Sequence, residues 1–466
     1  MNSAIAVGPV FESRAVRSPR RYALESAGLF GALGLLFFAP LAFGAVESWA
    51  IFVLEAGSTM LLAIWAIHQA ANGELKILSN AIFPPILTFG ALILFQIASH
   101  RTAYRAATVS SFLLYCSYGF LCFVAVQCLR HRWQLKAGAV ALSAYGFVLA
   151  IFSLTQNITS NGKLYWIRTP RLGGWIYGPY VNHNHYAGLM EMLFPIPLAI
   201  FLSPRVRRPH KAMALIASAV MASTIFLCGS RGGMLAFVVQ MALLAAILTS
   251  RHERGKTAVA LGAFFSLAFA VLAWMGSGEM LQRMTSIPVE TRTELTGGMR
   301  WSIDRDCLKM FAQKPVTGWG LGAFPEIYPQ FRSFYTNLAI DNAHNDYLQF
   351  LVETGAVGFG IIVWFLLSIF RSAFAKLRAS PTDLNAESAL AALLGVTGIL
   401  VHSFVDFNLQ IPANAALFFV LSAIAAMEPR FGSWHIHPEI KLGAAPAMRR
   451  RSGSHKRTRN AVTAEL

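Results

Sequence analysis

His344 ends the one long polar stretch of an otherwise apolar chain and is followed by Asn345 and Asp346. The polar stretch, residues 277–343, contains five arginines: Arg283, Arg292, Arg300, Arg305 and Arg332. An imidazole with an ordinary pKa of about 6.5 suits a general base near neutral pH. The alternative is a ring at the membrane interface that hydrogen-bonds a lipid headgroup. If the protein performs chemistry, we expect it at His344, with the ring oriented by Asp341, Asp346 or Glu353.

Two further arginines lie in glycine-rich turns between apolar segments. Arg231 belongs to the turn 229–233, and Arg171 precedes Gly173 and Gly174. A guanidinium binds phosphate through two parallel hydrogen bonds, and glycines let a ligand approach the backbone closely. Together with Arg300, these side chains would suit a lipid-linked diphosphate. Contacts with lipid headgroups or with carboxylates are the alternative.

A polar segment also opens the helix expected over 185–203. Asn184, Gly188 and Glu191 share one face of that helix, because residues three and four apart are neighbours on its surface. Glu191 would lie one to two turns inside the membrane, where a charge is costly. We therefore expect Glu191 either to support the function or to pair with a neighbouring helix.

Four other polar residues are weaker candidates. His183 and His185 are two residues apart, so a helix would point them in different directions, which argues against a zinc pair. His402 and Asp406 reach the same side of the membrane as His344. The sequence contains no P-loop, no Rossmann glycine pattern and no CxxC pair. We expect neither a metal nor a cofactor.

The elements that position these residues are membrane helices. Hydrophobic residues make up 55% of the 466 residues and charged residues only 13%, whereas soluble domains have about 25% charged residues. A spanning helix needs roughly 20 apolar residues. Twelve segments qualify: 27–46, 48–68, 78–98, 109–129, 137–155, 185–203, 212–228, 233–249, 257–275, 350–371, 386–403 and 411–427. The expected fold is an all-α polytopic membrane protein with about twelve transmembrane helices and one large periplasmic loop.

The net charge of +17 reflects topology rather than nucleic-acid binding. Lysines and arginines near helix ends mark the cytoplasmic side, and most of them face that side when both termini are cytoplasmic. We expect three parts. These are a basic cytoplasmic tail over 1–26, a transmembrane domain over 27–428 with its outer loop at 277–343, and a basic cytoplasmic tail over 429–466. The last is expected to be disordered and bound to the membrane surface.

The long loop has some helical character of its own. Ile303, Cys307 and Met310 fall on one face of a helix over 300–311, and the glycine run 318–322 predicts a turn after it. The tenth span needs residues 347–352 to complete its crossing, which puts His344 at the outer interface. The five cysteines suggest buried apolar side chains rather than disulfides: Cys116, Cys122, Cys128, Cys228 and Cys307.

The order of these motifs resembles that of the O-antigen ligase / O-antigen polymerase superfamily. His344-Asn345 is followed by nine residues, Gly355, two residues and Gly358, which is similar to the ligase signature. The Ser230-Arg231-Gly232 turn, the 182–187 segment and the 314–320 segment resemble the same family in the same order. The resemblance is best over 171–406.

The resemblance implies a C-type membrane glycosyltransferase of the bacterial inner membrane that works at the periplasmic face without a metal or a nucleotide. The donor would be a glycan on undecaprenyl diphosphate. The acceptor would be lipid A–core oligosaccharide in a ligase, or a second lipid-linked repeat in a polymerase. Some relatives transfer glycans to proteins or extend exopolysaccharides. A polysaccharide or lipid flippase is the alternative from another class, and the large outer loop counts against it.

The expected roles follow from both arguments. His344 would take the proton of the acceptor hydroxyl in a single inverting displacement. The leaving diphosphate would be neutralised by Arg231, Arg171 and Arg300. Asn345, Asn184, Glu191 and Asp346 would support the site. The lipid bilayer is the remaining partner, and no nucleic acid is expected.

Overall fold

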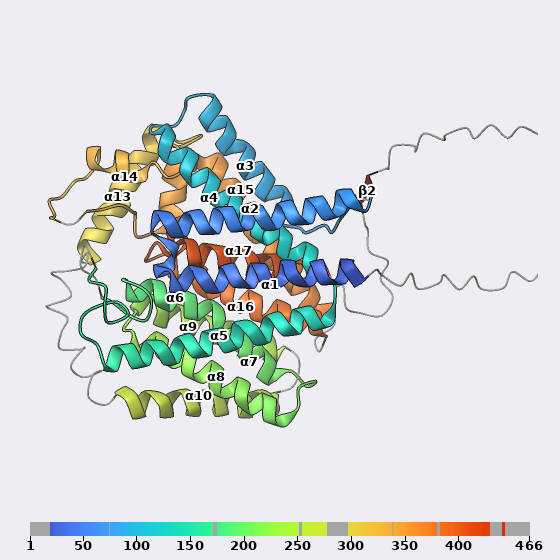
Figure 1. Ribbon diagram of the computed structural model, residues 1–466. Helices are drawn as coiled ribbons and strands as arrows, with labels where there is room; N and C mark the ends of the chain where they lie inside the picture. Colours follow the sequence, from blue (N-terminus) through green and yellow to red (C-terminus); the bar gives the residue numbers. More distant parts are fainter. Residues whose placement is uncertain are drawn as a thin grey trace, which may run out of the picture.

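The computed structural model describes residues 19–73, 75–170, 175–250, 254–276, 297–337, 339–379, 383–428 and 440–442. This part of the chain is almost entirely helical (Figure 1). Arg171, Arg283 and Arg292 lie outside the described residues, as does most of each predicted tail. The helices, in chain order, are α1 (Pro19–Leu41), η1 (Phe43–Ala45), α2 (Ser48–Ala71), α3 (Phe83–Ala98), α4 (Arg105–Cys128), α5 (Arg132–Ile158), α6 (His183–Leu193), α7 (Pro195–Leu202), α8 (Arg208–Leu227), α9 (Arg231–Thr249), α10 (Arg254–Gly276), α13 (Gly297–Gln313), α14 (Phe324–Ile327), η2 (Tyr328–Gln330), α15 (Asp346–Ala379), α16 (Leu384–His402), η3 (Asn408–Gln410) and α17 (Pro412–Ala426).

Each of the twelve predicted apolar segments coincides with helix. Among the described residues, eight helices are long and apolar enough to cross a membrane, and four shorter apolar helices account for the remaining segments. The expectation of an all-α, multi-pass membrane protein is therefore confirmed. The number of helices that cross the membrane, and the side on which the loops lie, stay predictions.

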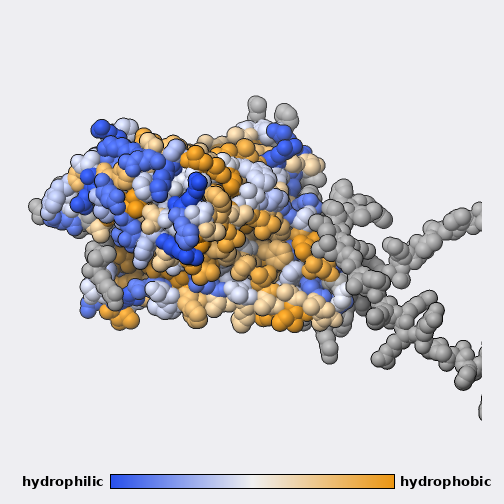
Figure 2. All heavy atoms as spheres, turned by 90° about the horizontal axis from the view of Figure 1, so that it is seen from above, coloured by the Kyte–Doolittle hydropathy of each residue, from blue (hydrophilic) through white to orange (hydrophobic). Residues whose placement is uncertain are grey.

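The two ends of the helix array differ in character. α13 and α14 lie at the end where α1 finishes and α2 begins, and the short strands β1 (Leu75–Ile77) and β2 (Ile440–Leu442) pair antiparallel at the opposite end (Figure 1). Hydrophilic residues gather around α13 and α14, whereas hydrophobic residues cover much of the central part (Figure 2). This distribution suits helices surrounded by lipid and a polar cap in water. We call the end with α13 the His344 end.

α16 lies at the centre and packs against α6, α7, α9, α15 and α17. Between α6 and α7, Pro195 has no amide hydrogen, so the carbonyl of Glu191 loses its helical donor. The side chain of Gln240 replaces that donor at 2.8 Å and also donates to the carbonyl of Leu394 on α16 at 2.9 Å. A buried amide thus joins α6, α9 and α16, where an unsatisfied carbonyl would be costly. The single helix predicted over 185–203 is divided at Pro195 for the same reason.

The long polar segment folds against the His344 end. Ile303, Cys307 and Met310 are all buried and share one apolar cluster with Phe324 and Tyr328, which confirms the predicted helical face. Most of the partly buried side chains packed against this cluster are aromatic, and they include Trp319 and Phe331. All five cysteines are free thiols, and four of them are buried, in keeping with small apolar side chains.

α15 is not one continuous helix, as the tenth predicted span would require. Gly355 has φ 66° and ψ −171°, a conformation that is essentially restricted to glycine. Segment 315–320 lies against this break and exchanges four backbone hydrogen bonds of 2.8–3.2 Å with residues 352–357. A Cβ on Gly355 would lie 2.3 Å from the Val316 oxygen, and one on Gly318 would lie 2.4 Å from the Glu353 carbonyl carbon. The glycine run that predicted only a turn therefore docks backbone against backbone onto α15.

Candidate functional site

His344 lies two residues before the start of α15 and has a positive φ of 55°. Its Nδ1 lies 3.4 Å from Oδ1 of Asp406, and its ring packs edge-on against Phe407 with centroids 4.7 Å apart. Asp406 is 1% exposed, whereas the His344 side chain keeps 17% of its surface accessible. The ring is therefore fixed on one side by a carboxylate and remains accessible on another.

The acidic partner of His344 is Asp406, not one of the three carboxylates nearer in sequence. Asp346 accepts hydrogen bonds from the Ser403 hydroxyl at 2.7 Å, the Leu409 amide at 3.0 Å and Gln410 at 3.2 Å. Its role is to hold the connection 403–410, which carries Asp406. Asp346 thus supports the site through Asp406 rather than by contacting the imidazole.

Arg300 brings a positive charge to the same connection from the first turns of α13. Its Nη1 donates to the carbonyl of Val405 at 2.9 Å. Within the described part of the protein, its Nε is buried without a hydrogen-bond acceptor. Arg300 and His344 both act electrostatically on Asp406 and on Asp304. His185 also acts electrostatically on Asp406. We therefore define a polar cluster of five residues: His344, Asp406, Arg300, Asp304 and His185.

In the polar cluster, burial and the neighbouring cations shift the pKa values of the two carboxyl groups in opposite directions. Burial alone would raise the pKa of Asp406, but the hydrogen bond and charge of His344, with the charges of His185 and Arg300, hold that pKa below its ordinary value. Asp406 is therefore ionised at neutral pH. Burial raises the pKa of Asp304, against the hydrogen bond from Asn345 and the charges of His344 and Arg300.

Asn345 connects two elements of the cluster. Its side chain lies close enough to Asp304 on α13 to lower the pKa of that carboxyl by hydrogen bonding, and its oxygen accepts a hydrogen bond from the amide of Leu348 in the first turn of α15 at 3.2 Å. It therefore sets the start of α15 relative to α13, which places His344 relative to Arg300.

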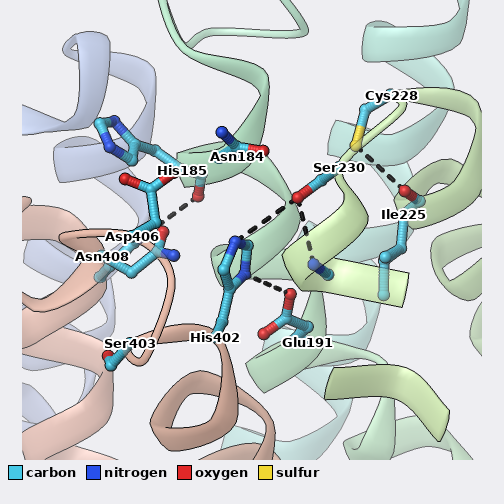
Figure 3. Close-up of polar contacts among 12 residues, drawn as sticks. Asn184, His185, Glu191, Ile225, Cys228, Ser230, His402, Ser403, Asp406 and Asn408 are labelled. Carbon is cyan, nitrogen blue, oxygen red and sulfur yellow. Dashed lines mark hydrogen bonds and ion pairs between the residues drawn. The ribbon is translucent and has the colours of Figure 1, made fainter. Parts of the chain in front are cut away.

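A second polar network lies deeper, between α6, α9 and α16 (Figure 3). Nδ1 of His402 lies 2.8 Å from Oε1 of Glu191, and its Nε2 lies 3.5 Å from the Ser230 hydroxyl. The Ser230 hydroxyl also accepts from the Gly233 amide and so caps α9. Glu191 is thus paired with a neighbouring helix, which is the second of the two possibilities considered for it.

Arg231 is the first residue of α9 and is exposed at the His344 end. The glycine after it is required by packing, since a Cβ on Gly232 would lie 2.5 Å from the His402 ring and 2.8 Å from Val405. Val405 is also the residue whose carbonyl binds Arg300. The start of α9, at Gly232, and Arg300 of α13 therefore both approach Val405 in the connection 403–410.

The polar start of α6 lies beside the same connection. Asn184 is buried in the first turn, which Asn182 caps at 2.8 Å, and Figure 3 draws it in the neighbourhood of His185 and Ser230. His185 packs edge-on against Phe407 with centroids 4.7 Å apart, whereas His183 packs against Trp175 at 4.4 Å. The two histidines do diverge as predicted.

One comparison with known proteins found a related family. Residues 216–377 match the family model described as O-antigen ligase. This segment is similar to the O-antigen ligase family. No curated protein matches the chain. The matched segment runs from α8 into α15, so it contains Arg231, Arg300 and His344.

Residues outside the matched segment complete the polar contacts of the residues within it. Glu191, His402 and Asp406 all lie outside residues 216–377. His402 contacts Ser230 and Asp406 contacts His344, both within the segment, and Glu191 pairs with His402. Sequence reasoning missed Asp304 and ranked Asp406 second. His402 and Asp406 are four residues apart at the end of the eleventh predicted span, and this spacing could have placed both among the main candidates.

Proposed function

We propose that this protein is a membrane glycosyltransferase that moves a glycan from an undecaprenyl-diphosphate carrier to an acceptor hydroxyl at the periplasmic face, with O-antigen ligase as its activity. The observation that carries the proposal is the pairing of His344 with the ionised Asp406 beside Arg300. The same end of the helix array has a polar cap, as a site facing the periplasm requires.

The geometry suggests how the reaction proceeds. Nδ1 of His344 faces Asp406, which leaves Nε2 to take the proton of the acceptor hydroxyl. The acceptor oxygen attacks the anomeric carbon from the side opposite the diphosphate, and the bond from that carbon to the diphosphate oxygen breaks. One displacement of this kind inverts the anomeric centre. Asp406 stabilises the imidazolium that forms.

The leaving group takes the bonding electron pair as a diphosphate anion. We assign its stabilisation to Arg300 and Arg231, with Arg171 as the third cation expected from the sequence. The unoccupied Nε donor of Arg300 supports this assignment, because a buried guanidinium donor without an acceptor is suited to an anionic ligand. The proposed mechanism needs no metal, so activity should persist in excess chelator.

The test uses His344→Ala and Arg231→Ala in a host that lacks its own ligase. Each variant should abolish glycan transfer to lipid A–core, with Arg305→Ala, an exposed arginine of α13, as the matched control. Normal transfer by both site variants, at normal protein levels, would overturn the proposal.

The runner-up is a repeat-unit polymerase that uses the same site. The two are distinguished by the acceptor. Deleting a polymerase should collapse the length of lipid-linked glycans, whereas deleting a ligase should leave long glycans on the carrier. A flippase would instead leave its substrate on the inner leaflet.

A further inference from the structure

A large apolar cavity lies in the half of the protein away from His344. Its volume is about 860 Å³, within the roughly 300–1,000 Å³ typical of ligand pockets. The first half of α16, residues 384–392, forms one wall, and the beginnings of α5 and α8 form others. Since α16 ends at His402 in the second polar network, this cavity belongs to the opposite end and is separate from the proposed glycosyl-transfer site.

The inside of the cavity is made of aliphatic and small side chains. Leu33 and Leu36 of α1, Leu142 of α5 and Ile196 of α7 contribute to it. Gly138 also faces the space, since a Cβ built on it would meet no atom within 4 Å. Such a surface offers no set of polar groups that would recognise a sugar or a nucleotide, and it is suited to hydrocarbon.

The cavity opens sideways, where the protein would meet lipid. Three apolar residues of its lining are largely exposed, namely Val140 at 60%, Met213 at 67% and Ile216 at 47%. They lie on α5 and α8, both of which are long and apolar enough to span a membrane. A hydrocarbon chain could therefore enter between these helices without passing through water.

Positive charge gathers at one end of the cavity. Lys136, Arg205, Arg207 and His210 line it there, against a single lining carboxylate, Glu387. Glu387 already accepts a hydrogen bond from the Ser203 hydroxyl at 2.7 Å and lies 3.9 Å from Arg205. Lys136 and Arg207 are exposed, so the rim retains a net positive charge that suits an anionic headgroup.

We propose that this cavity binds an anionic phospholipid, with the headgroup phosphate at Lys136 and Arg207 and an acyl chain along the apolar wall formed by α1, α5 and α8. An apolar interior, an opening toward the bilayer and a cationic rim are the three features that such an amphiphile needs. Neither a soluble anion nor a wholly apolar chain would use all three.

The test measures lipid retention by the full-length protein. The protein is exchanged into nanodiscs holding equal amounts of phosphatidylglycerol and phosphatidylethanolamine, released into mild detergent, and examined by native mass spectrometry. Wild type should retain phosphatidylglycerol in preference to phosphatidylethanolamine. Gly138→Phe, whose Cβ would meet no atom within 4 Å and whose ring would occupy part of the cavity, should abolish retention, and Gly138→Leu should reduce it.

The charge variants test the headgroup independently of the cavity. Lys136→Gln and Arg207→Gln should each lower the preference for phosphatidylglycerol by about fivefold, as expected for one cation near a membrane surface. Arg378→Gln, an exposed cation near the end of α15 that does not line the cavity, should change nothing. Absence of a lipid adduct on wild type, equal retention by Gly138→Phe, or an unchanged preference in both glutamine variants would each overturn the proposal.

Discussion

Nδ1 of His402 lies 2.8 Å from a carboxylate oxygen of Glu191, and the two side chains are 1% and 0% exposed. This pair joins the last turn of α6 to the end of α16, and the other ring nitrogen reaches the cap of α9. Removing only one partner of a buried pair of this kind strongly destabilises the fold, because the other polar group is left buried without compensation. It therefore positions the start of α9, and with it Arg231.

Glu191→Ala should lower the free energy of unfolding by about 3–5 kcal/mol. The double variant Glu191→Leu/His402→Leu should lose less than the sum of the two single leucine variants, since neither residue is then left unpaired. Thermal or denaturant unfolding in detergent measures both effects. Strict additivity of the single and double variants would show that the two side chains are not coupled.

Asp406→Asn should lower the turnover number for glycan transfer about 100-fold or more, because an amide does not stabilise the imidazolium of His344. The fold should persist, since the shapes of Asp and Asn are similar. Asp383→Asn, a helix cap at the far end of α16, is the matched control. If the turnover number of Asp406→Asn is within a factor of two of wild type, Asp406 takes no part in the reaction.

Acid should destabilise the protein partly through Asp406. The folded-state pKa of Asp406 lies below its ordinary value, so its ionic pairing contributes stability above about pH 4, the ordinary carboxyl range, and this contribution is lost as the pH falls further. Unfolding midpoints measured from pH 7 to pH 3 should therefore fall more steeply in wild type than in Asp406→Asn. Parallel curves would contradict the assigned direction of the pKa.

Arg300→Lys should raise the KM for the lipid-linked donor about tenfold or more, the loss expected when a charge-assisted hydrogen bond to a diphosphate is removed. Lysine keeps the charge but not the planar pair of donors. Arg305→Lys, on the exposed side of the same helix, should leave KM unchanged. If both lysine variants have the same KM, Arg300 contributes to the packing of α13 rather than to donor binding.

Gly355→Ala should destabilise the protein by about 2–3 kcal/mol or more, because its φ of 66° excludes a side chain and the added carbon would press on Val316. Gly360→Ala, where the added carbon would meet nothing within 4 Å, should stabilise α15 by about 0.5–1 kcal/mol. The break in α15 at Gly355 is tested by measuring whether the two alanine variants change the free energy of unfolding in opposite directions.

Local patterns were sufficient to predict the helices. The apolar segments, and the face of α13 that buries Ile303, Cys307 and Met310, follow from spacing alone. The carboxylate beside His344 does not, since Asp406 lies on a connection set by the hydrogen bonds of Asp346. The break at Gly355 was equally hidden, because it depends on contacts with residues 315–320 rather than on its own neighbours.

The four hydrogen bonds between segment 315–320 and α15 have a consequence for the reaction. The segment follows directly from α13, which carries Arg300, and the bonded part of α15, residues 352–357, lies about two helical turns after His344. His344, the proposed proton acceptor, and Arg300, the proposed anion-binding residue, are thus linked through hydrogen-bonded main chain where glycines permit no side chain. Under the proposed function, a lipid-linked glycan would meet a base and a cation whose spacing is already set, so little reorganisation would be needed during transfer.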